Sequence, residues 1–227
     1  MCPIPLNWKL GDPILSPVED MLSLDPVEIG SKATYKLLIG AIVPRPIAFI
    51  STVNSQGICN LAPFSFFNGV SSNPPAVMIA ITRKSHGEKK DTLRNIETTH
   101  QFVVNSVNEW MVEPMNQCSA EYPYGVNEMQ TVGLTPLPSQ KIQPPRVKES
   151  AIHLECELYD TLNVGDGSEG SSTIVIGKIV MLHIFSAAYK DGRILLEEIK
   201  PISRLAGTSY GHTNDIFQVP RPKLFQK

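Results

Sequence analysis

Cysteine is scarce in this sequence, and the cysteines lie far apart. The 227 residues contain four cysteines, at positions 2, 59, 118 and 156, with no CxxC pair among them. No group of histidines and cysteines has the spacing of a zinc site, so a structural metal ion is not expected. Isolated thiols are typical of a reducing compartment, and we therefore expect a cytoplasmic protein.

An excess of basic charge and a long hydrophobic run are also missing. The formal net charge is -2, which gives no general attraction to polyanions and argues against a nucleic-acid partner. Residues 1–20 contain four prolines and no continuous apolar segment, so neither a signal peptide nor a membrane anchor is expected there. The uncharged stretch 46–82 is interrupted by proline, asparagine and glycine too often for a membrane-spanning helix.

What the sequence does contain is enough apolar material for one globular domain. Hydrophobic residues make up 42% of the chain and charged residues 19%. These proportions allow a sizeable core and exclude the composition of a disordered chain. The beginning of the chain is rich in proline and poor in periodicity, so we predict an arm that lies over the domain or over a neighbouring chain.

Hydrophobic periodicity predicts a mainly β protein with few helices. Six β-branched or alternating segments are predicted strands: 47–53, 58–63, 76–81, 102–107, 152–159 and 173–185. Short helices are predicted at 31–42, 91–98 and 108–117, with Asp91 and Asn108 as N-caps of the last two. Because the strands do not alternate with long helices, an antiparallel barrel or sandwich is favoured over a doubly wound parallel sheet.

Neither the glycine-rich segment nor the histidines form a recognisable catalytic or dinucleotide-binding motif. Residues 165–170 match GxGxxG, but a strand follows where a dinucleotide site needs a helix, so a hairpin loop is predicted. No GxSxG elbow is present, and no histidine stands in a recognisable catalytic motif. His153 and His183 fall within predicted strands, where a hydrogen-bonded structural role is expected.

Residues 83–94 form a locally basic segment in an acidic chain. The sequence RKSHGEKKDTLR holds five lysines or arginines against two acids, a local charge of 5 − 2 = +3. Cationic side chains, hydroxyl donors and the free N–H groups of a helix N-terminus together suit a phosphate monoester. On charge alone, a solvated loop is an equally good interpretation.

Polar residues also interrupt the apolar segment 51–68. Ser51, Thr52, Asn60, Ser65 and Asn68 stand among aliphatic and aromatic neighbours. Each buried polar group left without a partner costs about 1–3 kcal/mol, so these groups either satisfy one another or bind a ligand with several polar edges. A flat heteroaromatic ring would suit the mixed lining.

Several ordered blocks resemble one known family. They are PRPIAFISTVNSQGICNLAPFSFFNGVSSNPPAVMIAI (44–81), KDTLRNI (90–96), FVVN (102–105), GVNEMQTVGLTP (125–136), ECEL (155–158) and PISRLAGTSYG (201–211). Together they are similar to the flavin reductase-like, FMN-binding split-barrel family, which includes flavoredoxin-type proteins and reductase components of two-component monooxygenases. The resemblance covers residues 25–212 and leaves an N-terminal arm (1–24) and a C-terminal tail (213–227) outside.

The resemblance implies a six-stranded antiparallel Greek-key split barrel with a few peripheral helices, working as a homodimer with FMN near the subunit interface. It also implies the positions of the cofactor-binding residues. Ser51 and Thr52 would meet the flavin or its phosphate chain; Asn60, Ala62, Ser65 and Phe66 the ring; Arg83, Ser85, Lys90, Asp91 and Thr92 the phosphate; Arg204 and Tyr210 would close the pocket.

The implied activity is hydride transfer from NAD(P)H to the flavin, after which electrons pass to a monooxygenase or another acceptor. The flavin carries this chemistry, so no catalytic side chain and no metal ion is expected. The alternative is an FMN-holding electron-transfer protein that a partner protein reduces. A third interpretation is a scaffold that has lost its ligand.

Overall fold

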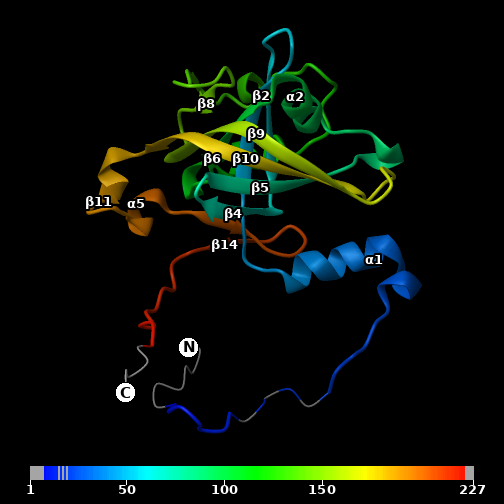
Figure 1. Ribbon diagram of the computed structural model, residues 1–227, viewed down its shortest axis with the longest axis vertical. Helices are drawn as coiled ribbons and strands as arrows, with labels where there is room; N and C mark the ends of the chain where they lie inside the picture. Colours follow the sequence, from blue (N-terminus) through cyan, green and yellow to red (C-terminus); the bar gives the residue numbers. More distant parts are fainter. Residues whose placement is uncertain (1–7, 15, 17, 19, 223–227) are drawn as a thin grey trace.

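One antiparallel sheet forms the body of the molecule. The computed structural model describes residues 8–14, 16, 18 and 20–222. Seven strands are hydrogen-bonded in the order β3-β2-β6-β9-β10-β5-β4 (Figure 1). Their bounds are β2 Ala48–Val53, β3 Cys59–Phe64, β4 Phe67–Ser72, β5 Pro75–Thr82, β6 Gln101–Ser106, β9 Ile152–Val164 and β10 Ser172–Ile184.

Short elements surround this sheet. β1 (Arg45–Pro46), β13 (Ile202–Arg204) and β14 (Tyr210–His212) form a three-stranded sheet, whereas β7 (Pro136–Leu137) pairs with β8 (Arg146–Val147), and β11 (Tyr189–Lys190) with β12 (Arg193–Ile194). The helices are α1 Pro26–Ala41, α2 Asp91–Thr99, α3 Val112–Gln117, α4 Glu128–Thr131 and α5 Leu196–Ile199. The mainly β, antiparallel fold expected from the sequence is confirmed.

The order of the strands makes the sheet curl. β3 and β4 lie at opposite ends of the hydrogen-bonded order, yet only Ser65 and Phe66 separate them in the chain. The Phe66 carbonyl accepts from the Ala80 N–H at 2.8 Å, which ties this connection to β5. The two ends of the sheet therefore meet, as in a barrel that is open along one seam.

Both faces of β2 are buried, which places hydrophobic cores on both sides of the sheet. Because successive side chains of a strand point to opposite faces, Phe49 joins one cluster with Leu61 and Met111, and Ile50 joins the other with Phe102. All five are at most 1% exposed. The second cluster fills the inside of the curled sheet.

The predicted helix caps are corrected. Asp91 is the first residue of α2, and the N-cap position is held by Lys90, which makes no side-chain capping bond within the described chain. Asn108 precedes a 3₁₀ turn (Glu109–Met111), but its side chain does not cap it. It is buried, accepts from the Ala151 N–H at 3.0 Å and donates to the Ile199 carbonyl. Tertiary partners have replaced the local cap.

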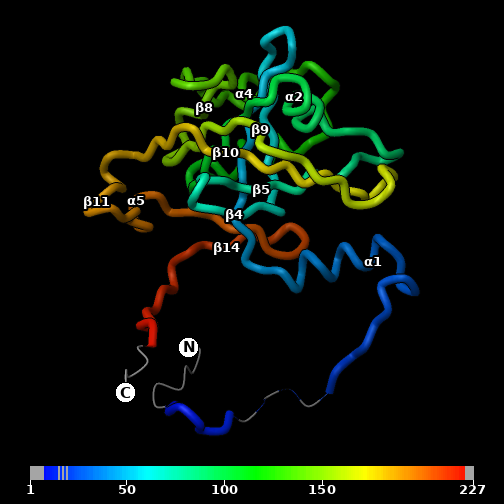
Figure 2. Tube along the Cα trace, viewed as in Figure 1, coloured from blue at the N-terminus to red at the C-terminus, as the bar shows by residue number. Residues whose placement is uncertain are grey.

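The arm and α1 project from the body (Figures 1 and 2). α1 begins at Pro26, five residues before its expected start, because the Asp25 carboxylate accepts from the Val27 N–H at 2.7 Å. The described arm residues are all exposed, so this part of the arm does not lie over its own domain. Of the two expectations for the arm, contact with a neighbouring chain remains.

Two classes of feature are not found within the described residues. No helix there is long and apolar enough to cross a membrane. The same residues contain no group of three or more histidine, cysteine, aspartate or glutamate side chains that could hold a metal ion.

Candidate flavin-binding site

Four buried polar side chains meet where α2 begins. The Asn60 amide on β3 donates to the Thr92 hydroxyl oxygen at 2.9 Å and to the Thr52 hydroxyl oxygen at 3.3 Å. The Asn95 amide on α2 also donates to Thr52, at 3.0 Å. None of the four is more than 7% exposed. The structure thus brings together Thr52, Asn60 and Thr92 from the predicted site and adds Asn95, which sequence reasoning missed.

This cluster of Thr52, Asn60, Thr92 and Asn95, the α2 cluster, borders a cavity of about 80 Å³. Lining residues from the predicted site are Asn60, Ala62, Lys90, Asp91 and Thr92, joined by Lys84, Glu121, Tyr122, Glu128 and others. The side-chain oxygen of Asn60, Oδ1, has no hydrogen-bond partner among the described residues, and the Thr92 hydroxyl hydrogen is free to donate. The α2 cluster can therefore offer both an acceptor and a donor to a ligand.

The basic and carboxylic acid residues that line this cavity are two lysines, Lys84 and Lys90, and three acids, Asp91, Glu121 and Glu128. The Lys84 ammonium lies 3.5 Å from the Asp91 carboxylate. Burial lowers the pKa of Lys90, whose ammonium lies 5.8 Å from the centre of the Phe64 ring and has no ion-pair partner among the described residues. An anionic ligand beside Lys90 would stabilise the protonated ammonium and so oppose the lowering of its pKa.

The N-terminus of α2 adds backbone donors to the same place. A helix begins with N–H groups that no residue of the helix can satisfy, and the N-cap Lys90 supplies no side-chain acceptor for them in the described chain. The helix dipole favours a negative group there. The Asp91 carboxylate already neutralises Lys84 in part. Lys90 is therefore the better candidate to bind an anionic ligand.

Arg83 and Ser85 lie before α2 and do not line the cavity. The Arg83 guanidinium donates to the Thr173 hydroxyl at 3.3 Å, and its Nε is buried without a partner among the described residues. Ser85 is exposed in a 3₁₀ turn (Ser85–Gly87). A Cβ on Gly87 would lie 2.7 Å from the Gly167 carbonyl oxygen, so this turn packs closely against residues 165–170. That glycine-rich segment is the β9–β10 hairpin loop, as predicted.

Ser51 belongs to a different network from its neighbour Thr52. Its hydroxyl donates to the Pro145 carbonyl at 2.5 Å and accepts from the Asn105 amide at 3.2 Å. Because adjacent strand residues face opposite sides of a sheet, Ser51 points away from the α2 cluster. It is fully buried and does not line the cavity.

The remaining predicted residues lie near the β3–β4 connection or on the three-stranded sheet. Ser65 accepts from the Arg45 Nε at 3.3 Å, and the Phe66 ring lies 6.5 Å from the Tyr35 ring of α1. The Arg204 guanidinium stacks 4.5 Å over the Tyr210 ring, and the Tyr210 hydroxyl donates to Asn116 at 2.9 Å. None of Ser65, Phe66, Arg204 and Tyr210 lines the 80 Å³ cavity.

Glu128 is the buried acid that sequence reasoning missed. It is 6% exposed, lines the cavity and accepts from the Leu61 N–H at 2.9 Å. Burial raises its pKa, and burial likewise raises the pKa of the nearby thiols Cys59 and Cys118, each to about 12. The one sequence feature that pointed to Glu128 was its position within the block 125–136, which carries part of the family resemblance.

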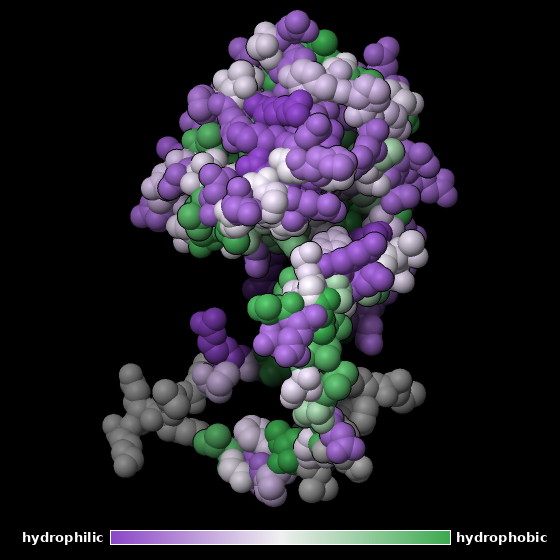
Figure 3. Space-filling model, turned by 90° about the vertical axis from the view of Figure 1, so that its right-hand side faces the viewer, coloured by the Kyte–Doolittle hydropathy of each residue, from purple (hydrophilic) through white to green (hydrophobic). Residues whose placement is uncertain are grey.

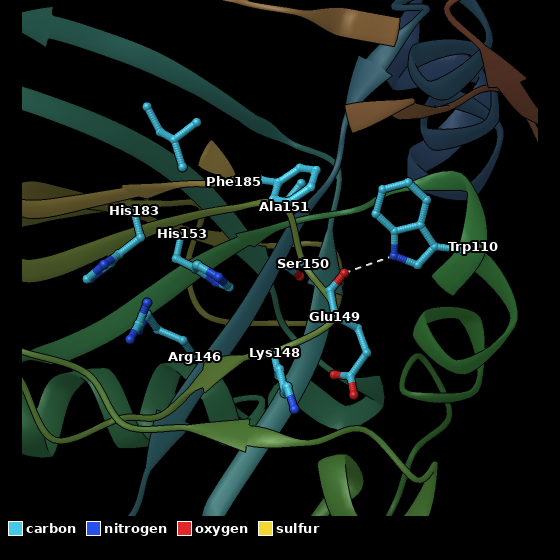
Figure 4. A pocket seen from close by; sticks show the side chains of 10 residues that line it. Trp110, Arg146, Lys148, Glu149, Ser150, Ala151, His153, His183 and Phe185 are labelled. Carbon is cyan, nitrogen blue, oxygen red and sulfur yellow. Dashed lines mark hydrogen bonds between the residues drawn. The ribbon is translucent and has the colours of Figure 1, made fainter. Parts of the chain in front are cut away.

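A larger cavity, of about 370 Å³, lies elsewhere and involves none of the predicted site residues (Figure 4). Arg146, Lys148, His153, His183 and Phe185 are among its lining residues. His183 is hydrogen-bonded to the fully buried Glu155 at 2.6 Å, and His153 to Asn105 at 2.9 Å. Both histidines are hydrogen-bonded, as expected.

The comparison with known families agrees with the fold and the blocks. A family model described as "Flavin reductase like domain" matches residues 40–197. This chain belongs to the flavin reductase-like family. The split-barrel resemblance read from the sequence is thereby confirmed, and binding of a flavin is the property that the family supports.

Solved structures of this family provide close matches. Nitrilotriacetate monooxygenase component B from Bacillus cereus is 39% identical, with a TM-score of 0.85, covering 89% of this chain and 100% of that one. The 2-nitrobenzoate 2-nitroreductase NbaA from Pseudomonas fluorescens is 31% identical, with a TM-score of 0.80 and coverage of 91% and 99%. Flavoredoxin from Desulfovibrio vulgaris shares the fold at 17% identity, with a TM-score of 0.66 over 78% and 91% of the two chains.

Proposed function

We propose that this chain binds FMN and acts as a flavin reductase, taking hydride from NADH or NADPH and passing the electrons to an acceptor. The observation that carries the proposal is the α2 cluster, which opens onto a cavity beside Lys90 and the N-terminus of α2. Membership of the flavin reductase-like family supports it.

The residues at the cavity fit the phosphate end of FMN. Lys90 supplies a partly desolvated cation, the start of α2 supplies N–H donors, and the Thr92 hydroxyl supplies a further donor. Charge-assisted bonds of this kind are the strongest that a phosphate makes with a protein. Arg83, with its unpaired buried Nε in the described chain, stands one loop away and adds positive charge.

The cavity is too small for the whole cofactor. It measures about 80 Å³, whereas pockets for ligands of this size occupy ~300–1,000 Å³. Ala62 lines the cavity, but Ser65 and Phe66 lie apart from it, at the β3–β4 connection. We therefore include a homodimer in the proposal, with a second copy completing the wall around the ring.

The roles of the side chains are binding and orientation. Bound FMN would supply the hydride-accepting ring, so the protein needs no general acid or base for that transfer. Asn60 and Thr92 would hold polar atoms of the cofactor, and Thr52 with Asn95 fixes the orientation of the Asn60 amide. Preorganised polar groups of this kind stabilise charge without reorganisation.

Anaerobic mixing of the FMN-loaded protein with NADH or NADPH tests the reductase activity. Loss of the oxidised flavin absorbance, at a rate that rises with the nicotinamide concentration, is expected. Unchanged absorbance with both nucleotides contradicts the reductase proposal.

An FMN-holding electron-transfer protein is the alternative, and the shared fold with flavoredoxin favours it. In that case, the protein retains FMN, neither nucleotide reduces it, and a reduced partner protein does. A protein that fails to bind FMN at all contradicts both forms of the proposal.

The acceptor and location complete the proposal. Nitrilotriacetate monooxygenase component B, by its name, is one component of a monooxygenase. We therefore propose a monooxygenase as the protein to which this chain delivers electrons. A cytoplasmic location is also proposed, since the described cysteines Cys59, Cys118 and Cys156 are all free and buried.

A further inference from the structure

We propose that α1 and the arm that precedes it pack against a second copy of this chain, so that the two copies of a dimer exchange their arms. The inference specifies how the proposed dimer is held together. It rests on exposed apolar surface and on one buried arginine, and it does not depend on flavin chemistry.

α1 lacks the contacts that normally stabilise a helix of its length. It has sixteen residues, and none of them is buried against any described part of the chain. Tyr35, Leu37 and Leu38 are 52%, 49% and 44% exposed. Isolated helices of about 12–15 residues are marginal in water, and Gly30, with φ 77°, interrupts this one. α1 therefore needs a partner surface that the described part of its own chain does not supply.

The arm continues the same apolar surface. Large exposed apolar side chains occur along the described part of the arm and at the start of α1: Trp8, Leu10, Ile14, Val18, Met21, Leu22, Leu24 and Val27. Scattered apolar residues are normal on a protein surface, but a contiguous series of this extent marks an interaction site. In Figure 3, hydrophobic side chains gather along the narrow stalk that leaves the rounded body.

Arg45 holds the end of α1 in a defined direction. Its guanidinium donates to the carbonyls of Ile39 and Ile42, to the Leu205 carbonyl at 2.9 Å and to the Ser65 hydroxyl at 3.3 Å. The residue is only 4% exposed. Because one buried side chain joins the helix end to Leu205, just after β13, and to the β3–β4 connection, α1 leaves the body at a fixed angle. Because α1 is held in this direction, its exposed surface can contact another molecule.

The amount of surface suits a dimer. Among the described residues from Trp8 to Val43, thirteen large apolar side chains are exposed. At ~60 Å² each, they would remove roughly 800 Å² per copy from water, which is the size of a stable interface. The same arm exists in every copy, so a two-fold symmetric exchange satisfies both arms at once.

Two further features favour a second copy over an unrelated protein. The β4 strand is an end strand of the main sheet, and Val70 on it is 53% exposed. Tyr35 of α1 lies beside Phe66, a predicted ring-binding residue. An arm exchanged at this place would cover the β4 edge of the partner copy.

Cross-linking of a mixture of isotopically labelled and unlabelled copies distinguishes an arm that packs on the partner copy from an arm that packs on its own chain. Full-length ¹⁴N and ¹⁵N proteins are unfolded together, refolded and treated with a lysine-specific cross-linker, and light scattering gives the mass. We expect a dimer and cross-links of mixed label between Lys32 or Lys36 and lysines of residues 45–212. A monomer, or a dimer whose arm cross-links carry a single label only, overturns the proposal.

Matched variants test the apolar contact itself. Leu38→Glu on α1 and Leu22→Glu on the arm should each raise the dimer dissociation constant at least tenfold. Leu182→Glu on β10, a comparably exposed leucine, is the control and should leave it unchanged. Leu22 makes no buried contact in the described chain, so its variant folds whatever happens to α1. Unchanged dimerisation of the Leu22 variant contradicts the proposal, and a separate FMN titration shows whether flavin binding fails independently.

Discussion

His153 shows how its surroundings set the protonation of a single side chain. Its Nδ1 lies 2.9 Å from the Asn105 Oδ1, which also accepts from the Val147 N–H. Since that oxygen is an acceptor, Nδ1 carries the hydrogen. Burial, with a smaller effect of Arg146, lowers the pKa of His153 to about 4. The folded protein therefore keeps this ring neutral at pH values where an unfolded histidine gains a proton.

This shift predicts a pH dependence of stability with a definite sign. The folded pKa lies below the unfolded value of about 6.5, so the contribution of His153 is complete above pH 6.5 and is lost as the pH falls toward 4. Urea unfolding at pH 7 and pH 5 should show that His153→Gln, which can still donate to Asn105, loses less stability on acidification than the wild type. The expected difference is on the order of 1–2 kcal/mol. Equal losses would show that another group is responsible.

Thr92 and Lys90 are the residues through which we expect the phosphate to be held. Thr92→Ala and Lys90→Ala should each weaken FMN binding about tenfold, the loss of one hydrogen bond or charge contact. Neither should unfold the domain, because the Asn60 amide keeps its bond to Thr52 when Thr92 is truncated.

The control for Thr92 lies on the same helix. The Thr98 hydroxyl bonds the Arg94 carbonyl and is exposed, so Thr98→Ala should leave FMN affinity as it is. Isothermal titration of each variant with FMN measures the effect. An unchanged dissociation constant for Thr92→Ala and Lys90→Ala would place the phosphate elsewhere.

At the scale of elements, Gly177 lets the backbone of β10 pack directly against the Phe102 ring. A Cβ on Gly177 would lie 2.2 Å from the Phe102 Cζ and 3.2 Å from the Cys156 Cβ. Phe102 is fully buried inside the curled sheet. The pairing of β9 with β10 shifts register next to Gly177, where the two strands bend.

Gly177→Ala should therefore strain the core. The forced displacement of Phe102 should lower the free energy of unfolding by about 1–3 kcal/mol, measured by thermal or urea denaturation. Gly69→Ala on β4 is the matched control, since a Cβ there meets nothing within 4 Å of the described chain. A Gly177 variant as stable as the Gly69 variant would contradict this account of the core.

Some elements could be predicted from the sequence and others could not. The six strands with dense β-branched residues were found, because hydrophobic periodicity records burial. β4 was missed because its sequence FNGVSS is polar and almost wholly exposed, and only its pairing with β5 makes it a strand. The N-cap role expected of Asn108 failed since distant carbonyl and N–H groups compete for its side chain.

The site was predicted in part for similar reasons. Asn60, Ala62, Lys90, Asp91 and Thr92 do meet at one cavity, although up to 32 positions separate hydrogen-bonded partners there. Asn95, Lys84 and Glu128 were not assigned, because their approach depends on how α2 and α4 pack on β3. No local pattern in a single sequence contains that information.

At the scale of the whole molecule, the curled sheet brings β2, β3 and α2 together, and the projecting α1 extends away from them (Figure 1). One copy therefore presents a corner of about 80 Å³, where we propose that phosphate binds, and an arm with exposed apolar side chains. We propose that the arm is covered in a dimer whose arms are exchanged.

The central claim is that the corner at Lys90, Thr92 and the start of α2 binds the phosphate of FMN. Titration of the apoprotein with FMN and with riboflavin, followed by flavin fluorescence, tests it most directly because the two ligands differ only in the phosphate. We predict that FMN binds at least tenfold more tightly than riboflavin, and that the difference shrinks in Lys90→Ala. Equal affinity for the two ligands, or no binding of either, would contradict the account.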